Sequence, residues 1–167
     1  MKKLHIILIL TMVALLSIAG SAAAETGQRN FRAHLAGSGE VPAVNTLAQG
    51  QAVFQLNEDG TELHYKLIAA NIENLFMAHI HMGPADGTGP IVVWLYLHPQ
   101  PPNPQDGLIE GRFDGVLAEG TITAADLTGP LASGSLGDLL EAMRAGNTYV
   151  NIHTLQHPGG EVRGQIH

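Results

Sequence analysis

Short runs of alternating hydrophobic and polar residues recur along the chain and are typical of β-strands. The run at residues 51–56 is followed by Asp59-Gly60 and a second run at 61–68. This arrangement predicts a hairpin, because glycine tolerates the positive φ of a tight turn. Further strands are predicted at residues 76–81, 91–97, 108–117, 149–154 and 161–167. Because the run at 91–97 is apolar throughout, we expect it to be covered on both faces.

One segment has the periodicity of a helix instead. An apolar stripe at helical spacing is formed by Leu136, Leu139, Leu140 and Met143. Ser135, followed three residues later by Asp138, is typical of a helix start, and Gly146 is typical of a helix end. With seven to nine short strands, the pattern predicts a mainly β fold: a Greek-key β-sandwich or barrel with one short helix.

The first 24 residues have the pattern of an export signal. Two lysines precede an apolar stretch at residues 4–18, and residues 22–24 are alanines of the kind that signal peptidase accepts. We expect cleavage after Ala24, a short N-terminal tail at residues 25–30 and a single domain at residues 31–167. The mature protein is then expected in the periplasm or outside the cell, with no membrane association after cleavage.

Composition narrows the possible functions. The chain has 8 basic and 15 acidic side chains, a net charge of −7, which argues against a nucleic-acid partner. It contains no cysteine, which excludes disulfides, iron–sulfur clusters, cysteine-ligated zinc fingers and thiol catalysis. Its unusual feature is nine histidines, so these residues are the candidates for chemistry.

Three of the histidines form a candidate metal site. His79 and His81 are two residues apart in a predicted strand, so their side chains share one face, with Cα atoms about 6.5–7 Å apart. Both rings can then reach one metal at roughly 2.0–2.1 Å. In the predicted strand 149–154, we expect Asn151 and His153 to lie on the face opposite the core. If the two strands are neighbours, His153 completes a site for copper or zinc.

Other polar residues have less specific patterns. The candidates for an additional metal ligand are His34, His64, His98 and His157. The alternative for all these rings is that they hydrogen-bond to carbonyl or carboxylate oxygens, or lie on a solvated face.

A structural role is expected for an acidic and a basic residue near the end of the chain. Glu161 and Arg163 share a face of the last predicted strand. We expect them to secure the turn at Gly159 and Gly160, because a lone ion pair is a weak indication of catalysis.

Three ordered segments resemble signatures of the CHRD domain family, which is named from chordin. The segments are residues 78–83 (AHIHMG) with 87–93 (GTGPIVV), residues 120–127 (GTITAADL), and residues 145–154 (AGNTYVNIHT) with 158–166 (PGGEVRGQI). The resemblance spans about residues 31–167. It implies an immunoglobulin-like β-sandwich or barrel that is distantly similar to copper/zinc superoxide dismutase.

The resemblance also bears on the site. Two histidines at this spacing on a strand are similar to copper ligands of the dismutase, which implies His79 and His81 as ligands and His153 as a candidate third. The chain lacks a cysteine for the dismutase disulfide, and no cluster resembling the zinc loop follows His81. These departures argue against dismutase activity. A solitary domain also lacks the other modules of chordin, so growth-factor binding is not expected.

Three functional classes follow, in order of preference. The first is an exported binding module whose histidines hold copper or zinc, with affinity falling as pH drops through about 6.5. The second is a structural or adhesive module that needs no metal or other cofactor and binds another protein or a surface polymer. The third is a copper redox enzyme, which needs an open position on the metal, so an enzymatic role is not favoured.

Overall fold

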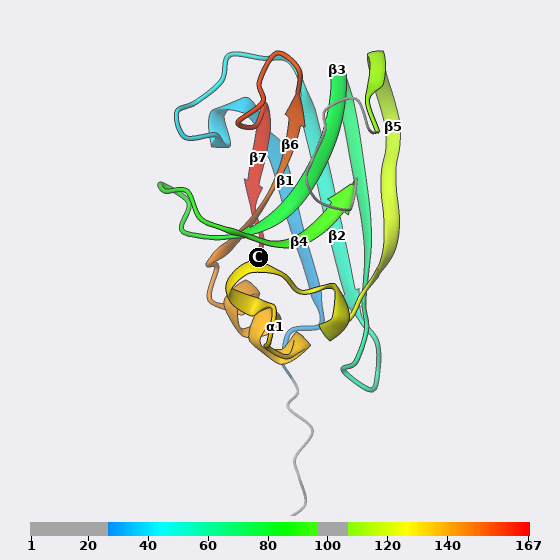
Figure 1. Ribbon diagram of the computed structural model, residues 1–167, viewed down its shortest axis with the longest axis vertical. Helices are drawn as coiled ribbons and strands as arrows, with labels where there is room; N and C mark the ends of the chain where they lie inside the picture. The colour runs from blue at the N-terminus through cyan, green and yellow to red at the C-terminus, as the bar shows by residue number, and fades with distance from the viewer. Residues whose placement is uncertain (1–26, 97–106) are drawn as a thin grey trace, which may run out of the picture.

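The computed structural model describes residues 27–96 and 107–167. The expected export signal at residues 1–24 and the candidate ligand His98 lie outside these residues. The described chain is mainly β, with one α-helix and three short 3-10 helices (Figure 1). The elements are β1 (Asn30–Ala36), η1 (Gly37–Gly39), β2 (Gln49–Leu56), β3 (Leu63–Met82), β4 (Ile91–Tyr96), β5 (Ile109–Ile122), η2 (Ala124–Asp126), η3 (Gly129–Leu131), α1 (Leu136–Arg144), β6 (Thr148–Thr154) and β7 (Val162–Gln165).

The strands form one antiparallel sheet that closes into a barrel. The first half of β3 pairs with β2 and β5, and its second half pairs with β6 and β4. Because β1 pairs with β2 and β7, and β7 pairs with β6, the ring β1–β2–β3–β6–β7 is complete. Two backbone hydrogen bonds between Arg32 and His167, at 2.9 and 3.0 Å, extend the contact that closes this ring. The expected mainly β barrel-like fold with one helix is confirmed.

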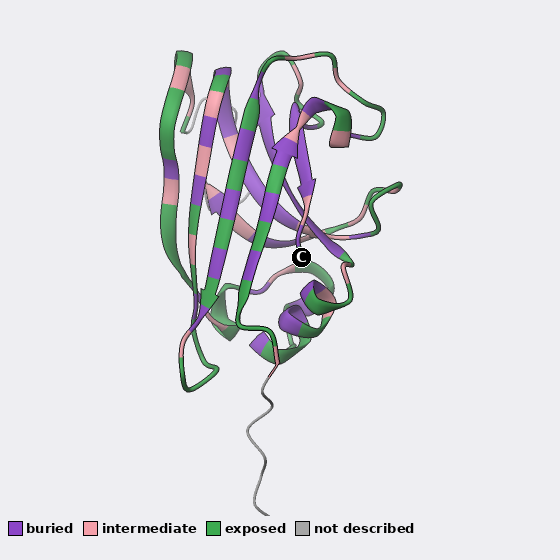
Figure 2. Ribbon diagram, turned by 180° about the vertical axis from the view of Figure 1, so that it is seen from behind, coloured by how far each residue is buried: buried purple, intermediate pink, exposed green. Residues whose placement is uncertain are grey.

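Alternating burial directs one face of each strand into the barrel. On β1, Phe31, Ala33 and Leu35 are buried, whereas Arg32 and His34 are exposed. The same alternation is visible along β2 (Figure 2). Removing these aliphatic and aromatic side chains from water is the main force that holds the strands in this register.

The predicted hairpin and helix are both present. Leu56 of β2 lies opposite Leu63 of β3, and Gly60 in the turn has a φ of +73°. The helix α1 follows Ser135, whose hydroxyl accepts a hydrogen bond from the Asp138 amide while the Asp138 carboxylate accepts one from the Ser135 amide. The helix lies at one end of the barrel (Figure 1). Its buried stripe joins the core there.

The strand boundaries differ from the sequence-based prediction. Strand β1 and the first residues of β2 were not expected, and β5 continues to Ile122 rather than ending at residue 117. The two strands predicted at 61–68 and 76–81 are parts of one 20-residue strand, β3. Between them Asn71 and Asn74 have positive φ values of 55° and 54°, and the pairing with β5 shifts register there. The chain therefore bends through irregular residues without leaving the sheet.

Strand β4 is less enclosed than its apolar sequence predicts. Val92, Val93 and Leu95 are buried, but Trp94 and Tyr96 are only half-buried. The reason is that Trp94 lies on the outward side of the sheet, where it covers a layer of polar side chains instead of the core.

Candidate metal centre

Strands β3 and β6 bring the three candidate ligands together. His79 and His81 on β3 alternate with fully buried core residues, and Asn151 and His153 on β6 do the same. In the antiparallel register His79 lies opposite Asn151. All four side chains therefore project from the same outward face of the sheet, as the alternation in the sequence predicts.

The three imidazole rings converge on one point. One ligand nitrogen from each ring lies within 4.8 Å of the others, and Nδ1 of His79 is 3.2 Å from Nε2 of His153. Two nitrogens bound to one zinc or copper at tetrahedral angles lie about 3.3–3.4 Å apart, and they cannot exceed about 4.2 Å. One pair already has nearly this spacing, and a separation as wide as 4.8 Å must close by roughly 1.4 Å to reach the tetrahedral value.

Two backbone carbonyls orient the rings. Nδ1 of His81 lies 2.8 Å from the carbonyl oxygen of Gly89, and Nδ1 of His153 lies 2.9 Å from that of Pro158. A carbonyl oxygen only accepts hydrogen bonds, so each Nδ1 carries the proton and each Nε2 keeps its lone pair. Histidines that bind metals are usually held in this way, with the outer nitrogen donating to a carbonyl or carboxylate.

The inward nitrogens are buried. His79 is fully buried, His153 is 5 % exposed and His81 is half-buried. Among the described residues, Nε2 of His79 and Nε2 of His81 are buried atoms without a hydrogen-bond partner. A buried polar atom left unpaired costs about 1–3 kcal/mol. A metal bound to Nε2 of His81 would recover this cost at that atom, whereas His79 reaches the cluster through its other nitrogen, Nδ1.

Burial also keeps the rings neutral. The pKa of His79 is lowered to about 2, chiefly by burial and then by the neighbouring His153 and His81. Burial lowers the pKa of His153 to about 4 against the opposing hydrogen bond to Pro158, and it lowers the pKa of His81 as well. The neutral ring is the form that binds metals. These rings therefore take up protons at a lower pH than the 6.5 expected of a free imidazole.

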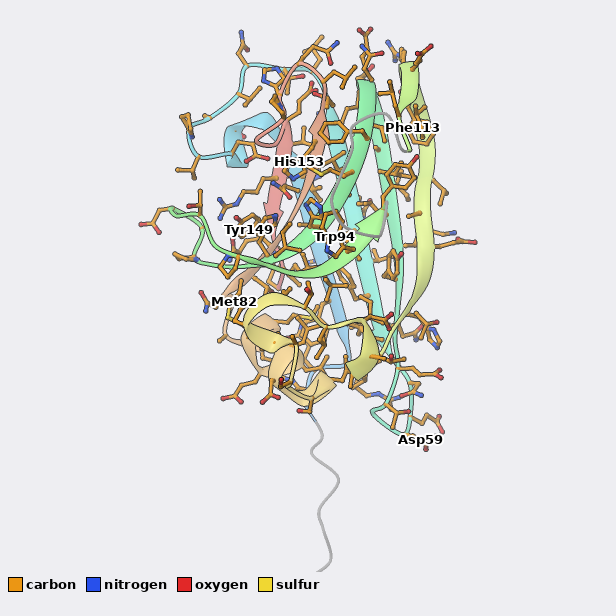
Figure 3. The ribbon with its side chains drawn as sticks, viewed as in Figure 1. Asp59, Met82, Trp94, Phe113, Tyr149 and His153 are labelled. Carbon is orange, nitrogen blue, oxygen red and sulfur yellow. The ribbon has the colours of Figure 1, made fainter. Side chains whose placement is uncertain are left out.

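Aromatic rings lie against the histidines; Trp94, Tyr149 and His153 are labelled in Figure 3. Trp94 of β4 lies edge-to-face with His79, with ring centroids 4.2 Å apart. Tyr149 of β6 stacks on His81, with centroids 4.8 Å apart and an interplanar angle of 4°. The guanidinium carbon of Arg163 lies 3.4 Å from the centre of the Tyr149 ring, a cation–π contact.

The other candidate histidines do not join this cluster. His34 is exposed on β1. His64 is exposed on the first half of β3, where its Nδ1 lies 2.9 Å from Oγ1 of Thr121. His157 is half-buried in the turn after β6. Within residues 27–96 and 107–167, the group that could hold a metal ion consists of His79, His81 and His153.

Glu161 and Arg163 have separate sets of partners. The Glu161 carboxylate accepts hydrogen bonds from the hydroxyls of Thr46, at 2.6 Å, and Thr154, at 2.7 Å. Arg163 donates to two carbonyls of the loop at residues 83–90, at 2.6 and 2.8 Å. Both side chains therefore connect β6 and β7 to neighbouring loops.

The two glycines before β7 differ in their surroundings. Gly160 has a φ of +125°, and a Cβ there would lie 2.4 Å from Oε1 of Glu40, so a larger residue does not fit. Gly159 is exposed, and a Cβ would meet no atom within 4 Å.

Sequence reasoning missed the residues that orient and enclose the rings. The carbonyls of Gly89 and Pro158 come from loops, and no local pattern marks them as hydrogen-bond acceptors. Trp94 and Tyr149 read as ordinary strand residues. Asn151 was assigned to the correct face but to no role, although its spacing of two residues from His153 was a usable signal.

Comparison with known proteins identifies one family. The family model described as CHRD domain matches residues 31–166. Neither the curated proteins nor the solved structures contain a significant match to the chain. Within the described residues there is no helix with the length and hydropathy needed to cross a membrane.

Proposed function

The chain belongs to the CHRD domain family, and we propose that it is an exported β-barrel binding module whose three histidines hold one copper or zinc ion. The observation that carries this proposal is the orientation of His81 and His153. Each commits Nδ1 to a backbone carbonyl and so keeps a lone pair on Nε2, within a cluster of nitrogens no more than 4.8 Å apart.

The donor set suits these two metals. Imidazole nitrogen binds zinc and copper well, and a site of a given type generally prefers Cu²⁺ to Zn²⁺. Because the ligands come from β3 and β6, a bound ion cross-links these two strands. Binding to the folded state alone also stabilises the fold, by about 2.7 kcal/mol when the free ion is at 100 times its Kd.

Metal titration tests the proposal. Purified, tag-free protein is expected to bind one equivalent of Zn²⁺ or Cu²⁺ and to melt at a higher temperature with the ion bound. The variant His79→Ala is expected to lose this uptake, whereas His64→Ala is a matched control on the exposed part of the same strand and should keep it. Uptake that is absent in the unmodified protein, or unchanged in His79→Ala, contradicts the proposal.

A second candidate function is partner binding without a metal. Three hydrophobic side chains are exposed in the loops that precede β2 and β7: Leu47 at 84 %, Val41 at 40 % and Leu155 at 43 %. Thr46 and Glu161 join these two loops, so the side chains lie in connected parts of the surface. Metal analysis of the protein isolated from its own host distinguishes the two candidate functions. Partner binding without a metal requires no stoichiometric ion, whereas the metal-binding function does.

A further inference from the structure

A fourth polar side chain, Asn151, faces the three histidines. It is 3 % exposed and lies opposite His79 in the pairing of β3 with β6. Its amide oxygen Oδ1 is 3.0 Å from Nε2 of His153, the same nitrogen that lies 3.2 Å from Nδ1 of His79. Asn151 therefore points its side chain at the place where the histidine nitrogens converge.

The buried carboxyl group of Glu40 lies on the far side of the Asn151 amide from the histidines. A Cβ at Gly160 would lie 2.4 Å from Oε1 of Glu40 and 2.9 Å from Nδ2 of Asn151, so both atoms adjoin this glycine. Oε1 is a buried acceptor without a hydrogen-bond partner among the described residues. This orientation places the amide donor Nδ2 on the side of the Glu40 carboxyl group, which accepts a hydrogen bond when it is ionised. Oδ1 is therefore the atom that faces the histidines.

With this orientation, His153 has an oxygen beside each ring nitrogen. The Pro158 carbonyl lies 2.9 Å from Nδ1, and Oδ1 of Asn151 lies 3.0 Å from Nε2. Both oxygens are acceptors, but a neutral imidazole has only one N–H to donate. A second proton would place a charge on a ring that is 5 % exposed, which is costly without a paired anion.

A proton on His79 does not resolve this conflict. If Nδ1 of His79 donates to Nε2 of His153, that nitrogen is satisfied, but Oδ1 of Asn151 still lies 3.0 Å from an atom that has no proton to give it. A cation between these atoms is attracted to all the lone pairs at once. The separations of 3.0 and 3.2 Å are also close to the ligand–ligand spacing of about 3.3–3.4 Å around a tetrahedral zinc.

We infer that Asn151 Oδ1 is the fourth ligand of the metal centre, which then has three nitrogen donors and one oxygen donor. This inference rests on the proposed function, that the histidines hold a metal ion. With four protein ligands the coordination sphere is closed, which is typical of structural metal sites, whereas catalytic sites keep a position for water or substrate. The centre would therefore stabilise the barrel without opening a position to a small anion.

Cobalt and azide provide the test. Co²⁺ is a coloured stand-in for Zn²⁺, and azide changes its visible spectrum only if the anion can enter the coordination sphere. The spectrum of the unmodified Co²⁺-protein is expected to stay the same when azide is added. In Asn151→Ala we expect Co²⁺ to bind at least about tenfold more weakly, since losing even an indirect support of a metal site costs about 10- to 100-fold. The spectrum of this variant should change with azide.

Two further variants make the result specific. Asn151→Asp keeps an oxygen donor and adds a negative charge, so it should bind Co²⁺ more tightly and remain closed to azide, even if the alanine variant does not fold. Asn147→Ala makes the same chemical change at an exposed position before β6 and should match the unmodified protein.

The outcomes separate this inference from the proposed function. A spectrum of the unmodified protein that already responds to azide, or an Asn151→Ala variant with unchanged affinity, overturns the assignment of Asn151 alone. An unmodified protein that takes up no Co²⁺ and no Zn²⁺ overturns the proposed function and this inference together.

Discussion

Burial distinguishes the histidines of strand β3 from one another. His64 and His79 belong to the same strand, β3. His64 is exposed and lies beside the Thr121 hydroxyl, whereas His79 is fully buried, and burial is the main cause of its low pKa of about 2. A histidine of the second kind is held in the neutral form that metals bind.

At this scale we predict that the metal-free protein loses stability as pH falls below about 6.5. Histidine in the unfolded chain takes up a proton near pH 6.5, but folded His79 and His153 do so only near pH 2 and 4. Unfolding therefore takes up protons in this pH range. Each of the two histidines contributes a slope of up to about 1.4 kcal/mol per pH unit to the free energy of unfolding.

Glu40 acts in the opposite direction. Burial raises its pKa to about 7, partly offset by Arg163, so between pH 4.5 and 7 its contribution to stability decreases as pH rises. The buried histidines outnumber this carboxyl group, so the net slope should follow the histidines. Urea unfolding at pH 7, 6 and 5 with a chelator present measures this slope. His79→Gln should make it shallower, and an equal slope in that variant would refute the explanation.

At the scale of elements, β7 is short but holds the loop beside the site. The side chains of Arg163 and Gln165 donate to three backbone carbonyls of the loop at residues 83–90. Near the end of the loop, a Cβ at Gly89 would lie 1.6 Å from a carbonyl oxygen of β3, so only glycine allows this approach. The approach brings the Gly89 carbonyl to Nδ1 of His81. Strand β7 thus helps to position His81 through this loop.

We predict that Arg163→Gln weakens both the fold and the metal site. The variant loses two charge-assisted hydrogen bonds to the loop and the contact with Tyr149, which should cost about 2–4 kcal/mol of stability. Zinc affinity should fall about tenfold, because His81 is less firmly oriented. Urea unfolding and zinc titration measure the two effects, with Arg32→Gln on the exposed face of β1 as the control. Lost stability with unchanged zinc affinity would mean that the loop serves the fold alone.

At the scale of the whole molecule, closure of the barrel makes the site possible. Strand β3 pairs with β2 and β5 near its start and with β6 and β4 near its end. Strands β1 and β7 connect β2 to β6 and so complete the ring in which β6 lies beside β3. The histidines lie on the outside of this ring, where aromatic side chains cover them (Figure 3). The core inside the barrel is hydrophobic and separate from the histidine cluster.

The proposal that the protein is exported has its own prediction at this scale. We expect the mature protein to begin at Glu25, because Ala22 and Ala24 are the small residues that signal peptidase selects. Expression of the full chain in a bacterial host, followed by mass spectrometry of the exported fraction, measures the new N-terminus. Ala24→Arg should block cleavage and leave the precursor. An exported protein that still begins at Met1 would contradict the prediction.

The sequence by itself determined the local features of this protein. Alternation with a period of two placed His79 and His81 on one face of a strand and Asn151 and His153 on one face of another, because side-chain direction in a strand depends only on neighbouring residues. The turn at Gly60 and the cap of α1 were predictable for the same reason. The continuity of β3 was not, since Asn71 and Asn74 resemble the end of a strand.

Only the tertiary structure decided that these faces meet. His79 and His153 are 74 residues apart, and their contact depends on the pairing of β3 with β6, which no local pattern encodes. The carbonyls of Gly89 and Pro158 reach the rings because loops fold over the sheet. The low pKa values arise from the exclusion of water by the assembled barrel and its aromatic cover. The types of donor atom are therefore a property of the sequence, whereas their spacing, orientation and charge are properties of the fold.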